Sequence, residues 1–204
     1  MRRIYRKAKK ANQLCNKENK MRKIIVSEGM TVDGIFEAET MGKWAHPSYS
    51  DERDEVIRKL VLASDSLLLG RTTYDLQAWY WPSQKNDKYG IANHKNSITK
   101  YVVTSKPLQA QWDHSLVIKE NVLEEIAKLK QQPGGGILIE GSATLVESLA
   151  QASLIDEYRF LVHPAIMGSG KRFFKEGTDM TRLKLVESKT LPLGVVLLCY
   201  EPTK

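Results

Sequence analysis

Three short stretches of the sequence combine glycine, hydroxyl and basic residues in the order that phosphate-binding turns use. They are Gly70-Arg71-Thr72-Thr73, Thr104-Ser105-Lys106 and Gly141-Ser142-Ala143-Thr144. Each follows a short apolar run, and the first and third also precede a segment with helical spacing. A helix N-terminus offers free N–H groups and a positive dipole to an anion, and arginine pairs bidentately with phosphate. The three stretches together therefore favour a phosphorylated dinucleotide as ligand.

Two other glycine-containing stretches are weaker candidates for phosphate binding. Residues 134–136 are three consecutive glycines, but they precede an apolar run instead of following it, which favours a helix-to-strand turn. The stretch MGSGKR at 167–172 suggests a P-loop, yet that motif requires glycine where Ala165 stands and serine or threonine where Arg172 stands. Gly141 is therefore the glycine that we expect at a phosphate.

Apolar runs that alternate with amphipathic segments must position these turns. The pattern predicts strands at 23–30, 66–71, 100–106, 115–118, 136–141 and 154–164, and a closing hairpin over 183–200. It predicts helices at 51–64, 72–79, 121–132 and 143–152, with capping boxes at Thr72-x-x-Asp75 and Thr144-x-x-Glu147. Strands alternating with helices indicate one α/β domain, residues 21–204, with a mixed, mostly parallel sheet and an antiparallel C-terminal edge.

Composition and charge exclude several classes of function. The chain is 42% hydrophobic and 27% charged, with no apolar run near the roughly 18 residues of a membrane span. The net charge of +7 lies entirely in residues 1–20, so the rest sums to zero and offers no basic surface for nucleic acid. The two cysteines and four histidines lack metal-ligand spacing. We expect a cytoplasmic protein without a metal, a membrane anchor or a nucleic-acid partner.

The basic segment 1–20 has two interpretations. One is a solvated, disordered arm or peripheral helix, as expected for such a composition. The other is that translation naturally starts at Met21, because Lys17-Glu18 can be encoded by a bacterial ribosome-binding sequence. Mass spectrometry of the endogenous protein distinguishes the two, since a peptide from residues 7–20 would exclude the second.

Five motifs in order along the chain resemble the dihydrofolate-reductase-like family. They are VDG at 32–34, LLLGRTTYD at 67–75, YVVTSK at 101–106, ILIEGSATLVESL at 137–149 and LIDEYRFLVHPAIMGSGKRFF at 154–174. Within the family, the chain looks most like the branch homologous to the C-terminal reductase domain of bifunctional riboflavin-biosynthesis proteins. The resemblance covers Lys23 to about Glu201. It implies a three-layer fold around an eight-stranded mixed sheet, with NADPH as hydride donor to a small heterocycle.

The resemblance also implies roles for the motif residues. Gly70, Arg71, Thr72 and Thr73 would hold the pyrophosphate and the 2′-phosphate of NADPH. Thr104, Ser105 and Lys106 would flank the adenosine, with Lys106 as a second contact to the 2′-phosphate. Glu140, Gly141, Ser142, Ala143 and Thr144 would form the loop over the pyrophosphate and nicotinamide. Asp33 and Gly34 lie in what resembles the loop that closes over the nicotinamide.

The same resemblance suggests where the substrate binds. True dihydrofolate reductases keep a carboxylate on the helix before the Gly-Arg strand, and the matching separation from Gly70 reaches Asp54. Asp54 is therefore the candidate catalytic acid and substrate contact, with Asp51, Glu52 and Glu55 as alternatives one to three residues away. Trp44 resembles the tryptophan of the substrate loop.

Glu140-Gly141 replaces the Gly-Gly pair of true dihydrofolate reductases, which argues against folate more than against NADPH. Three hypotheses about function remain. The first is an NADPH-dependent reductase of a pterin-like or other small heterocycle. The second is a reductase of a ribosylated pyrimidine in riboflavin biosynthesis, and the third is a non-catalytic nucleotide-binding protein that retains the fold. The branch also implies a homodimer.

Overall fold

The computed structural model describes residues 21–85 and 87–203. The basic segment 1–20, on which both interpretations of the N-terminus depend, lies outside these residues. The strands are β1 (Ile24–Thr31), β2 (Ser64–Gly70), β3 (Thr99–Val103), β4 (Ser115–Ile118), β5 (Gly136–Glu140), β6 (Glu157–His163), β7 (Leu183–Thr190) and β8 (Val196–Pro202). The helices are α2 (Met41–Trp44), α3 (Asp51–Ala63), α4 (Arg71–Tyr80), α5 (Ile91–Ser97), α6 (Val122–Gln131) and α7 (Ala143–Gln151), with short 3-10 turns between some of them.

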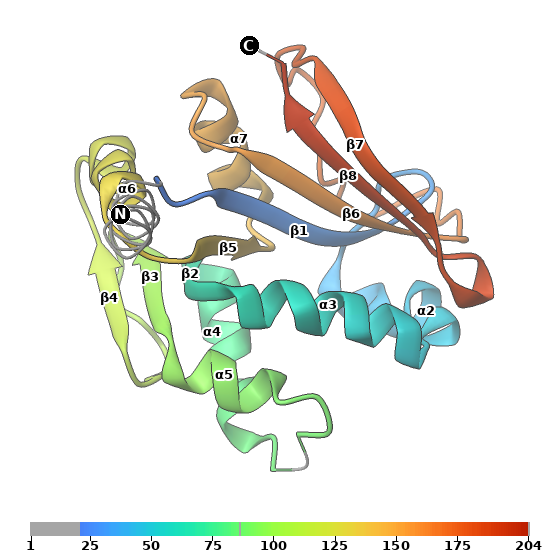
Figure 1. Ribbon diagram of the computed structural model, residues 1–204, viewed down its shortest axis with the longest axis horizontal. Coiled ribbons are helices and arrows are strands. Elements are labelled where there is room, and N and C mark those ends of the chain that lie inside the picture. The colour runs from blue at the N-terminus through green and yellow to red at the C-terminus, as the bar shows by residue number, and fades with distance from the viewer. Residues whose placement is uncertain (1–20, 86, 204) are drawn as a thin grey trace, which may run out of the picture.

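The eight strands form one twisted sheet in the order β4-β3-β2-β5-β1-β6-β8-β7 (Figure 1). The pairs from β4 to β6 are parallel, and β8 runs antiparallel to both β6 and β7. This is the predicted mixed sheet with an antiparallel C-terminal edge. The dihydrofolate-reductase-like fold expected from the sequence is confirmed.

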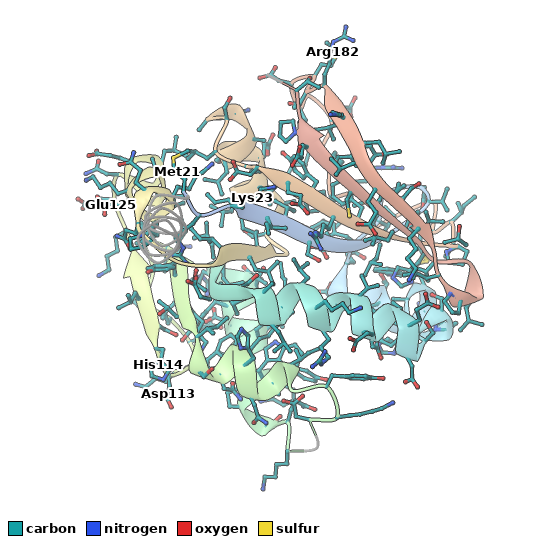
Figure 2. All side chains as sticks on the ribbon, in the orientation of Figure 1. Met21, Lys23, Asp113, His114, Glu125 and Arg182 are labelled. Carbon is teal, nitrogen blue, oxygen red and sulfur yellow. The ribbon has the colours of Figure 1, made fainter. Side chains whose placement is uncertain are left out.

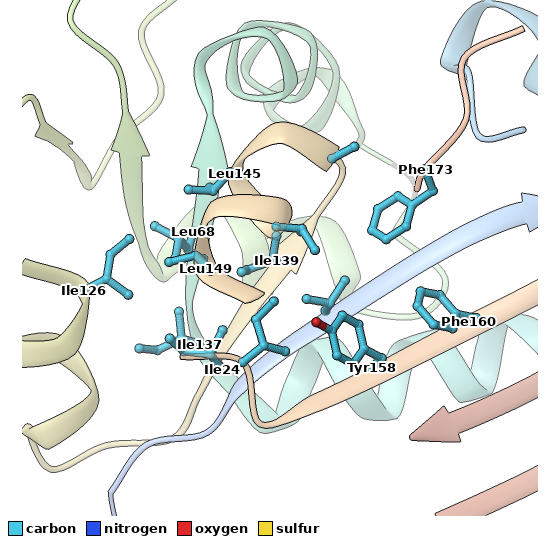
Figure 3. Packing of buried hydrophobic residues seen from close by; sticks show 14 of the residues in the cluster. Ile24, Leu68, Ile126, Ile137, Ile139, Leu145, Leu149, Tyr158, Phe160 and Phe173 are labelled. Atoms are coloured by element: carbon cyan, nitrogen blue, oxygen red, sulfur yellow. The ribbon is translucent and has the colours of Figure 1, made fainter. Parts of the chain in front are cut away.

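Helices cover both faces of the sheet, which gives three layers (Figure 1). On one face α3, α4 and α5 pack on alternate residues of β2, Leu67 and Leu69. On the other face α6 and α7 cover Leu68, together with Ile137 and Ile139 of β5 (Figure 3). Because successive strand residues point to opposite faces, the uninterrupted apolar run of β2 is what a strand buried on both sides requires.

Ion pairs join three strands at the edge where β1 begins. Lys23, directly before β1 (Figure 2), lies with its Nζ 3.5 Å from Glu157 of β6 and 3.2 Å from Glu201 of β8. The carboxyl ends of the parallel strands lie at the opposite edge, so that is where turns from several strands can meet.

The structure corrects several local predictions. Helix α5 and the short helix α2 lie in segments with no predicted element. The predicted strand 100–106 ends at Val103, so Thr104 to Lys106 belong to the following turn. Both predicted capping boxes are wrong, because α4 begins at Arg71 and α7 at Ala143 without a side-chain cap. Within the described ranges, no helix is long and apolar enough to cross a membrane.

Candidate functional site

The three predicted phosphate turns lie side by side at the carboxyl edge of the sheet. They follow β3, β2 and β5, which are neighbours in the sheet, and Gly70 at the end of β2 pairs with Val103 directly before Thr104. The turns after β2 and β5 also touch. A Cβ placed on Gly70 would lie 2.3 Å from Ser142 Oγ, and one on Gly141 would lie 2.9 Å from Thr73 Oγ1. Neither turn therefore has room for a side chain at its glycine.

Two helices begin at these turns with their backbone N–H groups uncapped. Gly70 precedes α4 and Ser142 precedes α7, and neither helix has a side-chain hydrogen bond to its first turn. Gly141 and Ser142 both take left-handed conformations, with φ of 70° and 57°. The first N–H groups of a helix require a partner from outside it. Phosphate oxygens are suitable partners, so the uncapped N-termini fit a nucleotide.

The polar residues of these turns are partly engaged with one another. Arg71 Nη1 lies 2.9 Å from Asp75 Oδ2 one helical turn later, and its side chain is 30% exposed. Thr104 Oγ1 accepts a hydrogen bond from the Lys106 amide at 3.0 Å, while the side chain of Lys106 is exposed. Thr72, Ser105 and Thr144 are exposed, and Ala143 is buried against the core. Arg71 and Lys106 are therefore two cations of this edge with side chains at least partly open to solvent.

Glu140 ends β5 and is held by two residues that sequence reasoning did not single out. Its Oε2 forms an ion pair with Lys95 of α5, and accepts a hydrogen bond from Gln77 of α4 at 3.3 Å. The Lys95 side chain is only 3% exposed, and its Nζ lies 4.3 Å from the centre of the Trp81 ring. The negative charge of Glu140 is thus neutralised by a buried cation.

Glu28 of β1 is a second carboxyl group near the same edge, and no sequence motif singled it out. Ser27 pairs with Glu140, so Glu28 lies level with Gly141. The Gly141 amide donates to Glu28 Oε2 at 2.7 Å, and the Gly29 amide donates to Oε1 at 3.2 Å. Burial, together with the nearby charge of Glu140, raises the pKa of Glu28 to about 8 despite these two amide hydrogen bonds. Glu28 is therefore a neutral carboxyl group at pH 7.

Asp33 and Gly34 lie in a turn after β1 that is fastened to the loop after β6. Asp33 accepts hydrogen bonds from Thr31 Oγ1 at 2.6 Å and from the amides of Gly168 at 2.8 Å and Met167 at 3.2 Å. These donors lower the pKa of Asp33 to about 2. Gly34 has φ of 80°, and its carbonyl accepts from the Phe173 amide. The Asp33 carboxylate therefore joins two loops, and its contact with a cofactor stays a prediction.

The two predicted substrate residues lie in neighbouring helices. Trp44 ends α2, and Asp54 lies in α3. Trp44 is 3% exposed, and its Nε1 donates to Thr40 Oγ1 at 3.2 Å. Asp54 lies in the first turn of α3, with a side chain that is 28% exposed and an ion pair to Arg53 at 2.7 Å. The Arg53 guanidinium stacks on the Tyr49 ring at 3.8 Å. Contact of either Trp44 or Asp54 with a substrate stays a prediction.

His163, at the end of β6, is fully buried against this segment, and its ring packs edge-on to Trp44 at 5.3 Å. Its Nδ1 lies 2.7 Å from Ser48 Oγ, which donates its own proton to the Ala45 carbonyl. His163 Nδ1 must therefore carry the proton that it shares with Ser48. Burial and the Arg53 charge lower the pKa of His163 to about 4, so the ring is neutral. In the part of the chain that the structure describes, no group of three His, Cys, Asp or Glu side chains could hold a metal ion.

The fold and the three turns at the carboxyl edge of its sheet define a dihydrofolate-reductase-like domain with a site that fits a nucleotide. Comparison with known proteins is more specific. Residues 22–197 match the RibD C-terminal domain, and the chain belongs to this family. The Bacillus subtilis protein YyaP is 30% identical over 184 residues, which cover 89% of this chain and 95% of YyaP. The branch expected from the sequence is confirmed.

Solved structures agree with this assignment at the level of the fold. A putative riboflavin biosynthesis protein from Shewanella superposes with a TM-score of 0.67 at 18% identity, over 89% of this chain and 99% of the other. Dihydrofolate reductase from Enterococcus faecalis, complexed with NADP(H), superposes with a TM-score of 0.58 at 18% identity, over 89% and 97% of the two chains.

Proposed function

We propose that the protein is an NADPH-dependent reductase of a small heterocyclic compound, pterin-like or a ribosylated pyrimidine. One observation carries the proposal: two uncapped helix N-termini, at Gly70 and Ser142, meet at the carboxyl edge of the sheet with their glycine turns in contact. Open α/β sheets bind nucleotides at this edge. Membership of the RibD C-terminal domain family and the likeness to an NADP(H)-bound reductase support the same class of reaction.

Different residues of this edge would bind different parts of the cofactor. The amides of α4 and α7, entered through Gly70 and Gly141, would hold the pyrophosphate. Arg71 and Lys106 would hold the 2′-phosphate, because both are cations at the turns that flank it and both are exposed enough to reach it. When bound, the cofactor supplies a hydride. The protein orients the two reactants and excludes water from between them.

The substrate would lie on the side of the sheet that α3 covers. Trp44 and Asp54 belong to segments on this side, and the buried, uncharged ring of His163 packs against Trp44. Asp54 would contact the heterocycle, as the family resemblance implies. Arg53 would fix the position of the Asp54 carboxylate through their ion pair.

Titration of the full chain with NADPH and with NADH, followed by tryptophan fluorescence, tests the proposal. We expect NADPH to bind at least tenfold more tightly than NADH, which corresponds to about 1.4 kcal/mol from the 2′-phosphate. Arg71→Ala should remove most of this preference, whereas Arg182→Ala, which changes an exposed arginine next to β7, should keep it. Equal affinity for the two nucleotides would contradict the assignment of Arg71, and failure to bind either would contradict the proposed function.

Turnover distinguishes the reductase from the non-catalytic alternative. With NADPH bound, dihydrofolate, pterins and ribosylated aminopyrimidines should be offered in turn, and loss of NADPH absorbance followed. Oxidation of NADPH that depends on one of these compounds supports the reductase. Tight NADPH binding without turnover of any compound would favour a nucleotide-binding protein that retains the fold.

A further inference from the structure

We propose that Glu28 is the proton donor of this site, delivering a proton to the heteroatom of the bond that is reduced. The inference rests on the proposed function, because a proton donor is needed only if a hydride is transferred. It goes beyond the family resemblance, which points to Asp54 and is silent about Glu28.

The position of Glu28 places its carboxyl group beside the cofactor turn. Glu28 and the Gly141 amide are joined by a 2.7 Å hydrogen bond across neighbouring strands. Gly141 opens the turn that would carry the pyrophosphate and nicotinamide. A carboxyl group that contacts this turn would therefore face a cofactor bound there.

The surroundings of Glu28 and Glu140 differ because a cation pairs with only one of the two carboxyl groups. Glu140 has Lys95 and Gln77 as partners, so its negative charge is compensated. Glu28 has two backbone amides and, among the residues that the structure describes, no ion pair with a cation. Because two neighbouring carboxylates repel each other, ionising both is unfavourable, and the group without a cation keeps its proton. Glu28 thus holds a transferable proton at neutral pH, whereas Glu140 is paired with Lys95.

The proposed step balances for a carbon–nitrogen double bond. The carbon receives the hydride, with its electron pair, from the reduced nicotinamide, which is thereby oxidised. The nitrogen takes the proton as the O–H bond of Glu28 breaks and an N–H bond forms. Glu28 is left as a carboxylate next to Glu140, an unfavourable pair of like charges, so it regains a proton from solvent before the next cycle.

Infrared difference spectroscopy tests the protonation of Glu28 without cofactor or substrate. The spectrum of wild type minus Glu28→Gln should show the carbonyl stretch of one protonated carboxyl group at about pH 6. This band should disappear with a midpoint near pH 8. The same difference taken with Glu124→Gln, an exposed carboxylate of α6, should lack the band. Absence of the protonated band in the Glu28 difference at neutral pH would overturn the proposal.

Kinetics then test the role of the proton. Glu28→Gln should lower kcat by about a hundredfold or more, the usual contribution of a general acid, with NADPH affinity within a fewfold of wild type. Glu28→Asp should recover part of the loss. In wild type, kcat should fall as pH rises past about 8, and Glu28→Gln should lose this limb.

The outcomes separate this inference from the proposed function. If NADPH does not bind at all, the proposed function fails. If NADPH binds and is oxidised by a substrate, but Glu28→Gln turns over as wild type does, the reductase stands and only the role of Glu28 is overturned. Loss of NADPH affinity in Glu28→Gln without a loss in kcat would show a binding role, and would overturn the proton donor in the same way.

Discussion

Replacing Gly70 by alanine tests the contact between the two phosphate turns. Gly70 has φ of −77°, so alanine suits its backbone, and any destabilisation must come from contacts. The new Cβ would lie 2.3 Å from Ser142 Oγ and 3.0 Å from Ser142 Cβ. The hydroxyl can rotate away, but the Cβ moves only if the turn moves. Overpacking of this kind costs about 2 kcal/mol, so Gly70→Ala should lose about that much stability.

A second substitution should relieve the clash. Ser142→Gly removes both atoms that the new methyl group meets, and glycine suits the left-handed conformation of this residue, φ 57°. The double variant should therefore be nearly as stable as wild type, which gives a coupling energy of about 1.5 kcal/mol between the two positions. Urea unfolding of the four proteins measures this energy.

A control shows that the coupling depends on contact. Gly90→Ala places a methyl group where nothing lies within 4 Å, at φ of 71°, so its cost is backbone strain alone. Combined with Ser142→Gly, its effect should be additive. Additive behaviour of Gly70→Ala and Ser142→Gly would refute the contact between the turns, and with it the geometry on which the proposed function rests.

Three further predictions concern the protonation, charge and assembly of the protein. The pKa of Glu28 lies above its reference value of 4.5, so between about pH 4.5 and 8 the folded state keeps a proton that the unfolded chain has released. As pH rises through this window, wild type should lose up to about 5 kcal/mol of stability relative to Glu28→Gln in urea unfolding, and parallel curves would contradict this prediction. Lys95→Met leaves Glu140 without its buried cation and should lower the free energy of unfolding by about 3 kcal/mol. Adding Glu140→Gln to this variant should restore part of the loss. An unchanged urea midpoint in Lys95→Met would show that the pair contributes nothing to stability. The family resemblance implies a homodimer, so sedimentation equilibrium should give twice the mass of the chain, and a monomer at micromolar concentration would contradict this.

The sequence was sufficient for the sheet because its strands are strongly marked. The run Leu67–Leu69 is apolar on both faces, and strands with this pattern must be covered by helices on both sides. The alternation of such runs with amphipathic segments predicted the parallel part of the sheet. The absence of helical spacing near the end of the chain predicted its antiparallel edge. Only α5 and α2 were missed among the named helices.

Helix α5 was missed because contacts distant in sequence stabilise it. Its sequence, from Ile91 to Ser97, is mostly polar and has no clear apolar stripe. Asn96 Oδ1 accepts from Trp112 Nε1 at 2.7 Å, and Lys95 pairs with Glu140 across the sheet edge. Partners so far along the chain leave no local pattern.

The capping boxes were wrong because both helices begin before the predicted cap residue. Thr72 and Thr144 lie inside the first turn of α4 and α7, where a side chain cannot cap the helix. The glycine turns enter each helix directly, and Ser142 in its left-handed conformation makes no cap hydrogen bond. This difference leaves N–H groups free, which a ligand-binding turn requires.

Of the candidate site, the sequence predicted the turns but not the acid. Gly70, Thr104 and Gly141 could be recognised because Gly70 ends a strand and the other two directly follow one. Glu28 could not, since its proton is retained only through burial and through Glu140, which lies 112 residues further along the chain. Local residue patterns do not record the electrostatic surroundings of a side chain.

Hydrogen exchange of the full chain with and without saturating NADPH tests the central claim most directly. If the cofactor lies across the carboxyl edge, amide protection should rise at residues 70–73 and 141–144, and at 104–106, while β7 and β8 should exchange as before. NADH at the same concentration should protect these segments less. Unchanged exchange at both glycine turns, or protection confined to another part of the protein, would contradict the account.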